Sequence, residues 1–215
     1  DVIAVGTGKA IKLGESGDVD VILVHAPKAE ESFVSEGYGI NRRKVMHNDF
    51  ILLGPPSDPA GIKGITSAAQ AVKQISKTNS AFISRGDDSG THKKEQEIWD
   101  KANISPKGTW YLEAGQGMGT VLQMAHEKMA YTLSDRGTYL AYRSKIDSVI
   151  VSEGDPVLYN PYGVIAVNPA KHPNTNYIRV MAFIGWLTSP ECQKMIAEFK
   201  KGGEVLFHPD AIQIE

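Results

Sequence analysis

The residues of this chain that are best suited to bind a small ligand lie in one stretch, residues 84–95, with the sequence SRGDDSGTHKKE. The stretch joins a short apolar run to a charged run, which predicts a strand, a tight loop and the start of a helix. The first amides of a helix have no acceptor inside it, and the helix dipole attracts negative charge there. Arg85 adds a permanent charge and a fork of donors that suits oxyanions. We therefore predict an anion site built from Arg85, the hydroxyls of Ser89 and Thr91, and the amides of Gly90 and Thr91.

A purely structural explanation of the same stretch competes with the anion site. Asp87 or Asp88 could cap the helix, with Arg85 as a surface partner. A lone Ser-Gly-Thr would favour this explanation, but an arginine, two glycines and two hydroxyls within so few residues favour the anion site. Asp87 is expected to orient Arg85 or to cap the helix, because two negative groups repel each other in a dry site.

A second glycine-rich stretch, AGQGMGT at residues 114–120, precedes a predicted helix at residues 121–128. Glycines are common at helix starts, and G-x-G-x-G is not the dinucleotide fingerprint G-x-G-x-x-G. The stretch would nevertheless be the second loop of its kind in the same part of the chain. We therefore predict that the amides of Gly117 and Met118 also contact the ligand.

A third turn, GTGK at residues 6–9, follows the apolar run at residues 3–5. A nucleotide-binding phosphate loop would need a glycine in place of Ile3 and a serine or threonine in place of Ala10, so that function is rejected. Two interpretations remain open: an anion-facing turn with Thr7 as a donor, or an ordinary strand-to-helix turn.

Two further residues lie at strand ends, where ligands of α/β proteins bind. His25 follows the apolar run at residues 19–24, and Ser134 follows the run at residues 130–133. For both we favour a structural role, in the case of Ser134 as a helix cap.

The composition excludes several classes of function. The chain has 215 residues, 41% hydrophobic and 22% charged, with a formal net charge of −2, which lacks the basic surplus of nucleic-acid-binding proteins. Its single cysteine, Cys192, cannot form an intramolecular disulfide. No apolar segment is long enough to span a bilayer. The hydrolase motifs G-x-S-x-G and H-E-x-x-H are missing, which argues against an enzyme.

Strands and helices alternate along the chain, which predicts an α/β fold with a mainly parallel sheet in its first part. Beyond the runs already named, extended runs are predicted at residues 42–47, 50–53, 110–113, 149–151, 158–159 and 162–167. Helices are predicted at residues 28–36, 66–77, 93–102, 175–187 and 190–200.

Five stretches together resemble periplasmic binding proteins for tetrahedral oxyanions, above all the tungstate-binding component of ABC transporters. They are VGTGKAIKLGESGDVDVILVHAP, SRGDDSGTHKKE, AGQGMGTVLQMA, YTLSDRGTY and NPYGVIAVNP, and they run through nearly the whole chain. The resemblance implies a type II periplasmic-binding-protein fold, with two α/β lobes, a hinge and a ligand cleft between the lobes. It assigns residues 1–80 and 163–215 to lobe I and residues 81–162 to lobe II.

The same resemblance implies what the protein does. It would capture a tetrahedral oxyanion, tungstate or molybdate first, and deliver it to the permease of an ABC transporter, without a cofactor, a metal cation, nucleic acid or membrane insertion. It would be periplasmic or extracellular, with a lipid anchor in a Gram-positive source, although this sequence contains no signal peptide or lipoprotein cysteine. Phosphate or sulfate binding, or the effector domain of a LysR-type regulator, are the alternatives.

One departure from the family concerns the beginning of the chain. Members of the family normally open with a strand and a Thr/Ser-rich loop whose hydroxyls bind the ligand. This chain begins at Asp1-Val2-Ile3, which resembles the second strand of the family. Either the first strand and its hydroxyl loop are missing from this sequence, or the protein does without them.

Overall fold

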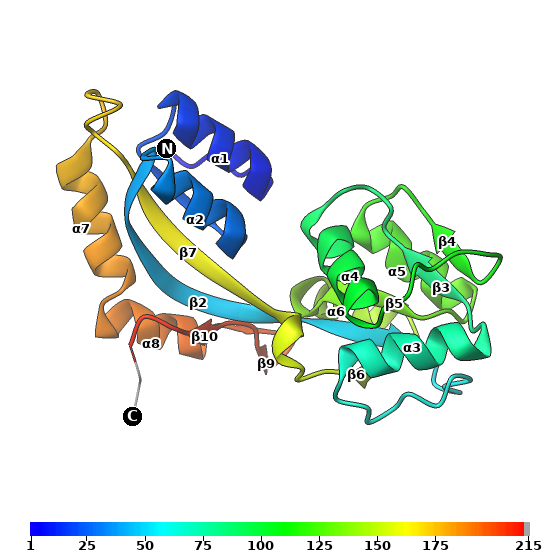
Figure 1. The fold of residues 1–215 in the computed structure, drawn as a ribbon. Coiled ribbons are helices and arrows are strands. Elements are labelled where there is room, and N and C mark those ends of the chain that lie inside the picture. Colours follow the sequence, from blue (N-terminus) through cyan, green and yellow to red (C-terminus); the bar gives the residue numbers. More distant parts are fainter. Residues whose placement is uncertain (213–215) are drawn as a thin grey trace. The chain divides into compact units, whose positions relative to one another are not determined.

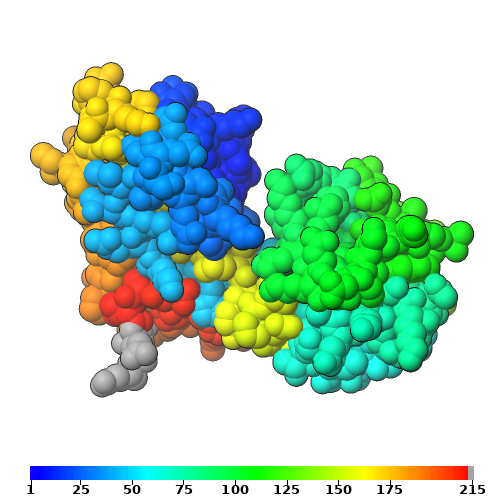
Figure 2. All heavy atoms as spheres, in the orientation of Figure 1, coloured from blue at the N-terminus to red at the C-terminus, as the bar shows by residue number. Residues whose placement is uncertain are grey.

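The computed structural model describes residues 1–212, which form a mixed α/β protein with two compact units. The first unit contains residues 1–48 together with the described residues from 160 onward, and the second contains residues 49–159. Both ends of the chain, blue and orange to red in Figure 2, therefore build the first unit. The chain enters the second unit after Asn48 and leaves it after Tyr159.

The sheet of the first unit has helices on both faces (Figure 1). Its strand order is β1-β7-β2-β10, and β1 pairs with β7 in the antiparallel direction. The strands are β1 (Val21–Val24), β2 (Gly39–Gly54), β7 (Tyr159–Val167) and β10 (His208–Pro209), and a separate hairpin joins β8 (Lys200–Lys201) to β9 (Glu204–Val205). The helices are α1 (Thr7–Ser16), α2 (Pro27–Ser35), α7 (Tyr177–Leu187) and α8 (Pro190–Glu198).

Strand β7 shows why both faces are covered. Successive side chains of a strand point to opposite faces. Val164 and Ala166 pack with residues of α7 and α8, whereas Ile165 and Val167 pack with residues of α1 and α2. All four side chains are fully buried, which is the reason for the continuous apolar run in this part of the sequence.

The second unit contains three consecutive segments in which a strand is followed by a helix. β3 (Phe82–Ser84), β4 (Tyr111–Glu113) and β5 (Thr132–Asp135) are followed by α4 (Gly90–Lys101), α5 (Met118–Glu127) and α6 (Arg136–Tyr142). β3 pairs with β4 in parallel, and a parallel bridge joins Phe82 to Tyr131, just before β5. The carboxyl ends of these strands therefore share one edge, the edge at which open α/β sheets bind ligands.

The remaining elements of the second unit close its core. They are α3 (Ala68–Thr78), β6 (Val149–Ser152) and the 3₁₀ turns η1 (Arg143–Lys145) and η2 (Pro156–Leu158). The end of β2 pairs with β5 and with β6, in both cases antiparallel. Trp99, Phe82 and Tyr131 are among the largest fully buried side chains.

The boundary between the units differs from the sequence-based assignment, which placed residues 49–80 in lobe I and residues 160–162 in lobe II. Residues 49–80 belong to the second unit, because the end of β2 pairs with β5 and β6 and because α3 packs into the core around Trp99. The two extended runs expected at residues 42–47 and 50–53 are one continuous strand of 16 residues, β2, and the boundary falls inside it.

Two further expectations are corrected. The sheet is not mainly parallel, since the pairs β1–β7, β2–β10, β2–β5 and β2–β6 are all antiparallel. The apolar run at residues 3–5 forms no strand, because it has no neighbouring strand in the described chain and leaves Val2 and Ile3 96% and 56% exposed. Among residues 1–212, no helix has the length and apolar character needed to cross a bilayer.

Candidate anion-binding site

Two strand-to-helix loops of the second unit are bonded to each other through their main chains. The arginine loop, residues 85–89, joins β3 to α4, and the glycine loop, residues 114–117, joins β4 to α5. The amide of Ala114 donates to the carbonyl of Ser84 at 2.9 Å, and the amide of Gly115 donates to the carbonyl of Arg85 at 2.8 Å. These bonds extend the parallel pairing of β3 with β4 and fix the two loops, and so the helices that follow them, to each other.

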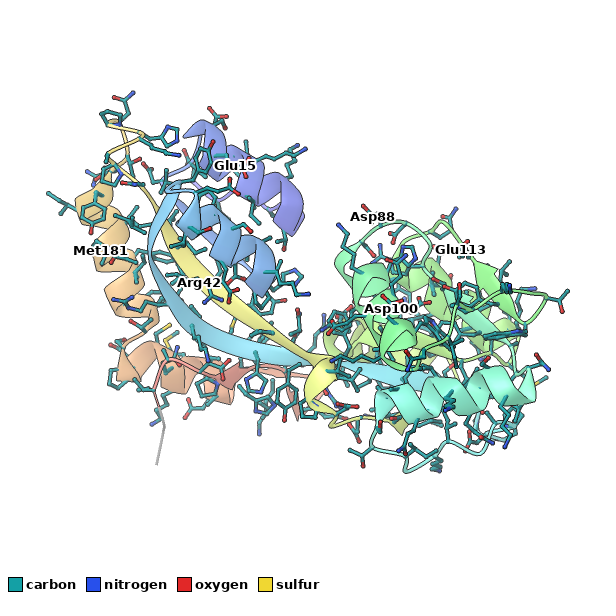
Figure 3. The ribbon with its side chains drawn as sticks, viewed as in Figure 1. Glu15, Arg42, Asp88, Asp100, Glu113 and Met181 are labelled. Atoms are coloured by element: carbon teal, nitrogen blue, oxygen red, sulfur yellow. The ribbon has the colours of Figure 1, made fainter. Side chains whose placement is uncertain are left out.

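The arginine loop turns sharply at Gly86, whose φ is +59°. A Cβ atom at this position would lie 2.7 Å from the Cβ of Glu113 at the end of β4. Only glycine combines the left-handed conformation with so close an approach. Asp88 is also left-handed, with φ +58°, and its carboxylate extends outward near Lys93 (Figure 3).

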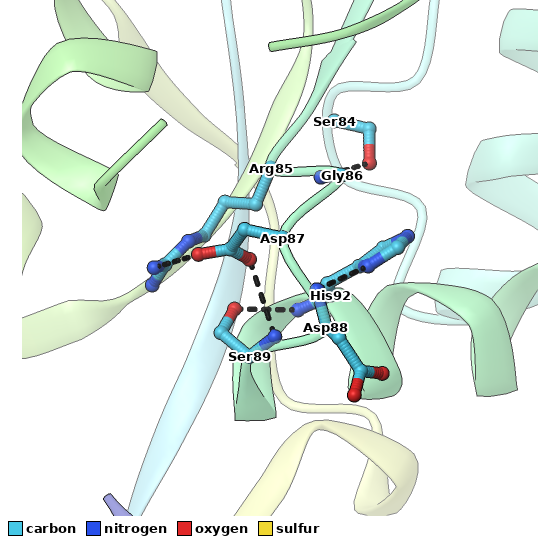
Figure 4. A network of polar contacts seen from close by, with 7 residues as sticks. All are labelled: Ser84, Arg85, Gly86, Asp87, Asp88, Ser89 and His92. Carbon is cyan, nitrogen blue, oxygen red and sulfur yellow. Dashed lines mark hydrogen bonds and ion pairs between the residues drawn. The ribbon is translucent and has the colours of Figure 1, made fainter. Parts of the chain in front are cut away.

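The Asp87 carboxylate organises the loop from within (Figure 4). One of its oxygens binds the guanidinium of Arg85, and the other accepts the amide of Ser89 at 3.2 Å. Burial raises the pKa of Asp87, but the hydrogen bonds from Ser89 and Arg85 outweigh it, so the pKa lies below its ordinary value and the group is ionised. Of the two roles expected for Asp87, the structure has the ion pair with Arg85, whereas the cap of α4 is Ser89 and neither Asp87 nor Asp88.

Arg85 still has hydrogen-bonding capacity after this pairing. Its side chain is 19% exposed, yet its Nε atom is buried and has no partner in the described part of the chain. Buried donors without an acceptor are rare in folded proteins, because each costs the loss of its bonds to water. An anion at this loop would supply the missing acceptor.

The start of α4 carries a neutral cap. The hydroxyl oxygen of Ser89 accepts the amide of His92 at 3.3 Å, and the hydroxyl also acts on the Asp87 carboxylate as a hydrogen-bond donor. The amides of Gly90 and Thr91 belong to the first turn, so the helix offers them no acceptor. Thr91 is buried at 7% exposure. The structure thus brings Arg85, Ser89, Gly90 and Thr91 together.

No side chain of the described residues caps the start of α5. Its N-cap is Gly117, in an extended conformation, and the amides of Met118 and Gly119 follow in the first turn. Gly115, with φ +61°, turns the glycine loop toward this helix start. Both predicted residues of this loop, Gly117 and Met118, therefore lie at an open helix terminus that is bonded to the arginine loop.

The start of α6 is different, although it also follows a strand, because no loop separates β5 from α6. Asp135 caps it and accepts the amide of Thr138 at 2.8 Å, so the cap is Asp135 and not Ser134 as predicted. Arg136 is held by Asp49 at 2.7 and 2.6 Å and by Glu153 at 2.6 Å. Negative groups of the protein itself already compensate the positive charges at this helix start.

A buried carboxylate behind the arginine loop was not recognised in the sequence. Glu95, 2% exposed, accepts the hydroxyl of Tyr111 at 2.7 Å and the indole N–H of Trp99 at 3.0 Å. Burial, outweighing these bonds, raises the pKa of Glu95. The bonds link α4 to β4. The spacing of Glu95 and Trp99, one helical turn apart, was the only signal of this arrangement in the sequence.

Thr7 and His25 lie in the first unit. Thr7 is half-buried at the start of α1, where the N-cap Gly6 provides no side-chain bond. His25 has a structural partner, since its Nδ1 lies 3.0 Å from the side-chain oxygen of Asn160 and its ring packs on Tyr162. Within residues 1–212, no group of three or more His, Cys, Asp or Glu residues could hold a metal ion.

Comparisons with known proteins agree with this fold. The family model of the PBP superfamily domain matches residues 1–191. A Haloferax volcanii protein named as a putative ABC transporter anion-binding protein is 53% identical over 215 residues. The match covers 98% of this chain and 63% of the Haloferax protein. The tungstate-binding protein TupA of Peptoclostridium acidaminophilum is 49% identical over 214 residues, which cover 98% of this chain and 75% of that protein.

Among solved structures, the tungstate-binding protein TupA of Desulfovibrio alaskensis superimposes with a TM-score of 0.92 at 46% identity, covering 98% of this chain and 86% of that one. In both comparisons the matched region covers 98% of this chain. The chain therefore belongs to the PBP superfamily and, within it, to the family of these TupA proteins.

Proposed function

We propose that this protein captures a fully ionised tetrahedral oxyanion, tungstate or molybdate, at the paired starts of α4 and α5 and delivers it to the permease of an ABC transporter. The observation that carries the proposal is the buried Nε of Arg85, which has no partner among residues 1–212 and lies in a loop bonded to the loop that precedes α5. The names of the TupA relatives supply the choice of tungstate.

The donors at this place suit an oxyanion with charge spread over four oxygens. Arg85 provides the compensating charge, and hydroxyl and amide groups provide neutral donors around it. The proposed neutral donors are the hydroxyls of Ser89 and Thr91 and the amides of Gly90, Thr91, Gly117 and Met118. In the first unit we propose Thr7, at the uncapped start of α1, as an anion donor.

The state of Asp87 favours a ligand without protons. A hydrogen phosphate needs an acceptor for the proton that it still carries, and Asp87 is the carboxylate of the arginine loop nearest to Arg85. Each of its oxygens already accepts one hydrogen bond, from Arg85 or from the Ser89 amide, so a phosphate proton would have to share an oxygen with one of these donors. Tungstate, molybdate and sulfate carry no proton at neutral pH, so we propose that they bind more tightly than phosphate.

We propose a binding protein without catalytic turnover, located outside the cytoplasmic membrane, in the periplasm or at the cell surface. Both parts of this proposal are supported by the relatives named for anion or tungstate binding. The low reactivity of the single thiol, Cys192, supports the lack of turnover. Burial, with a contribution from Glu191, raises the pKa of Cys192, so the thiol is a poor nucleophile.

Calorimetry and thermal unfolding of protein freed of bound anions test the proposal. Tungstate, molybdate, sulfate and phosphate are added in turn at the same pH and ionic strength. A ligand present at a hundredfold excess over its dissociation constant stabilises the fold by about 2.7 kcal/mol, so we expect tungstate and molybdate to raise the melting temperature. If none of the four anions binds, the proposal is wrong. Tighter binding of phosphate than of tungstate would refute the role given to Asp87.

A further inference from the structure

We propose that His92 is a positioning residue that holds the arginine loop in its ligand-binding shape without touching the ligand. The inference rests on the proposed function, because it concerns the same site. His92 is the third residue of α4 and is 8% exposed. Its ring accepts a main-chain hydrogen bond from Asp88 in the arginine loop. Two of the proposed donors, Arg85 and Ser89, lie before and after Asp88 in the same loop.

His92 contacts the loop at two points (Figure 4). The amide of Asp88 donates to Nδ1 of the ring at 3.0 Å. The amide of His92 itself donates to the hydroxyl oxygen of Ser89 at 3.3 Å. A single residue thus fixes the orientation of the Asp88 peptide and of the Ser89 hydroxyl.

The bond to Asp88 determines the tautomer of the ring. A main-chain amide can only donate, so Nδ1 must be without a proton and a neutral ring carries its proton on Nε2. Nε2 lies 3.2 Å from the side-chain amide nitrogen of Gln96. Two donors cannot share a hydrogen bond. We therefore assign the oxygen of the Gln96 side-chain amide, and not its nitrogen, to the position that faces Nε2.

Asp88 needs such support because its conformation is disfavoured. With φ +58° it adopts the left-handed region, which most residues avoid and which aspartate tolerates. Its carboxylate does not hold it, since that side chain is 83% exposed with Lys93 at 3.5 Å. Asp88 stands between Asp87, which binds Arg85, and Ser89, which caps α4. A change at Asp88 therefore reorients the guanidinium and the hydroxyl together.

Three substitutions distinguish the loss of the hydrogen-bond acceptor at Nδ1 from the loss of the volume of the ring. In His92→Asn the side-chain oxygen branches from the same carbon as Nδ1 and can accept the Asp88 amide. His92→Leu has nearly the shape of asparagine without an acceptor. In His92→Gln the oxygen lies one bond farther out, beyond the position of Nδ1. Asn and Leu are therefore a matched pair for this one hydrogen bond.

Calorimetry with tungstate gives the expected order. His92→Asn binds within about twofold of the wild type, whereas His92→Leu and His92→Gln bind about two- to tenfold more weakly, the range for loss of one neutral hydrogen bond. Equal affinities of Leu and Asn variants would overturn the proposal, provided that the wild type binds. If the wild type binds no anion, the proposed function fails instead, and the two failures are distinguishable.

Nitrogen NMR of the wild-type protein tests the inference without relying on a variant that folds. We expect the proton of the His92 ring on Nε2, with Nδ1 unprotonated, and we expect the Asp88 amide to exchange slowly with solvent. In His92→Leu the exchange of this amide should be faster, and in His92→Asn it should remain slow. A proton on Nδ1 at neutral pH would contradict the proposal, because the Asp88 amide could not then donate to it.

Discussion

Replacing Arg85 by alanine is expected to weaken tungstate binding more than any other single truncation in the arginine loop. The guanidinium provides the positive charge of the proposed site and carries the buried Nε, which has no partner in the part of the chain that the structure describes. Truncating one member of a buried, hydrogen-bonded charge pair costs about 2–5 kcal/mol. At about 1.4 kcal/mol per decade, this is roughly a 30-fold to several-thousand-fold loss of affinity.

We expect part of this loss to come from Asp87. In the wild type, Asp87 is paired with Arg85, and the two side chains are 23% and 19% exposed, so solvent screens the pair only in part. After Arg85→Ala, an ionised carboxylate without its partner faces the bound dianion. The double variant Arg85→Ala with Asp87→Asn removes this repulsion, and the asparagine oxygen can still accept the Ser89 amide. We expect the double variant to bind tungstate at least about tenfold more tightly than Arg85→Ala, which corresponds to a difference of about 1.4 kcal/mol in binding free energy.

The assay is calorimetry with tungstate, supported by three control variants. Arg85→Lys should recover only part of the affinity, because a point charge does not reproduce the fork of donors. Thr91→Val should cost about tenfold or less, the contribution of one neutral hydrogen bond. Lys93→Ala removes a cation whose side chain is 64% exposed and which lies 3.5 Å from Asp88. Exposed pairs contribute little, so this variant should bind within about threefold of the wild type.

Two outcomes would refute this reasoning. If Arg85→Ala binds within about threefold of the wild type while Thr91→Val does not, the charge of the ligand is compensated elsewhere. If the double variant binds more weakly than Arg85→Ala, Asp87 supports the ligand directly and the repulsion assigned to it is wrong.

Two further predictions concern groups around the site. Because the pKa of Glu95 is raised above its ordinary 4.5, its contribution to stability is present below about pH 4.5 and is lost as the pH rises through the raised value. Urea unfolding from pH 4 to 7 should therefore show wild-type stability falling relative to Glu95→Gln, and parallel curves would contradict this. Asp135→Ala should lower the free energy of unfolding by about 0.5–2 kcal/mol through loss of the α6 cap, with tungstate affinity unchanged. A large loss of affinity in this variant would show that the α6 start belongs to the site.

The sequence was informative about the arginine loop because the relevant signals are local. Gly86 and Ser89 act on their immediate neighbours, and the structure has a left-handed turn at the first and the cap of α4 at the second. The apolar runs likewise identified most strands. The extent of β2 was not predictable in the same way, because Asn48 and Asp49 interrupt the apolar pattern while the strand continues through them.

Features that depend on distant parts of the chain were missed for a physical reason. The assignment of residues 49–80 to the second unit depends on the pairing of β2 with β5 and β6, which follow it by about 80 and 100 residues in sequence. Glu95 lies in a strongly charged helix, and the sequence pattern therefore does not mark it as buried. Its buried position includes a hydrogen bond from Tyr111 of the neighbouring strand. Local periodicity contains no information about such partners.

The three helix starts of the second unit suggest how one repeated segment is adapted to bind a ligand. α4, α5 and α6 each follow a strand, and each helix start carries partial positive charge. The N-cap residue decides what compensates that charge: Asp135 is an internal anion at α6, whereas Ser89 and Gly117 are neutral caps at α4 and α5. A neutral cap satisfies no more than one amide and adds no negative charge, so the rest of the first turn stays available to an external anion. The two neutral caps belong to the two loops that are bonded to each other, and the acidic cap belongs to the segment whose arginine is already held by Asp49 and Glu153. The distribution of one residue type among three similar segments thus accounts for the location of the proposed site.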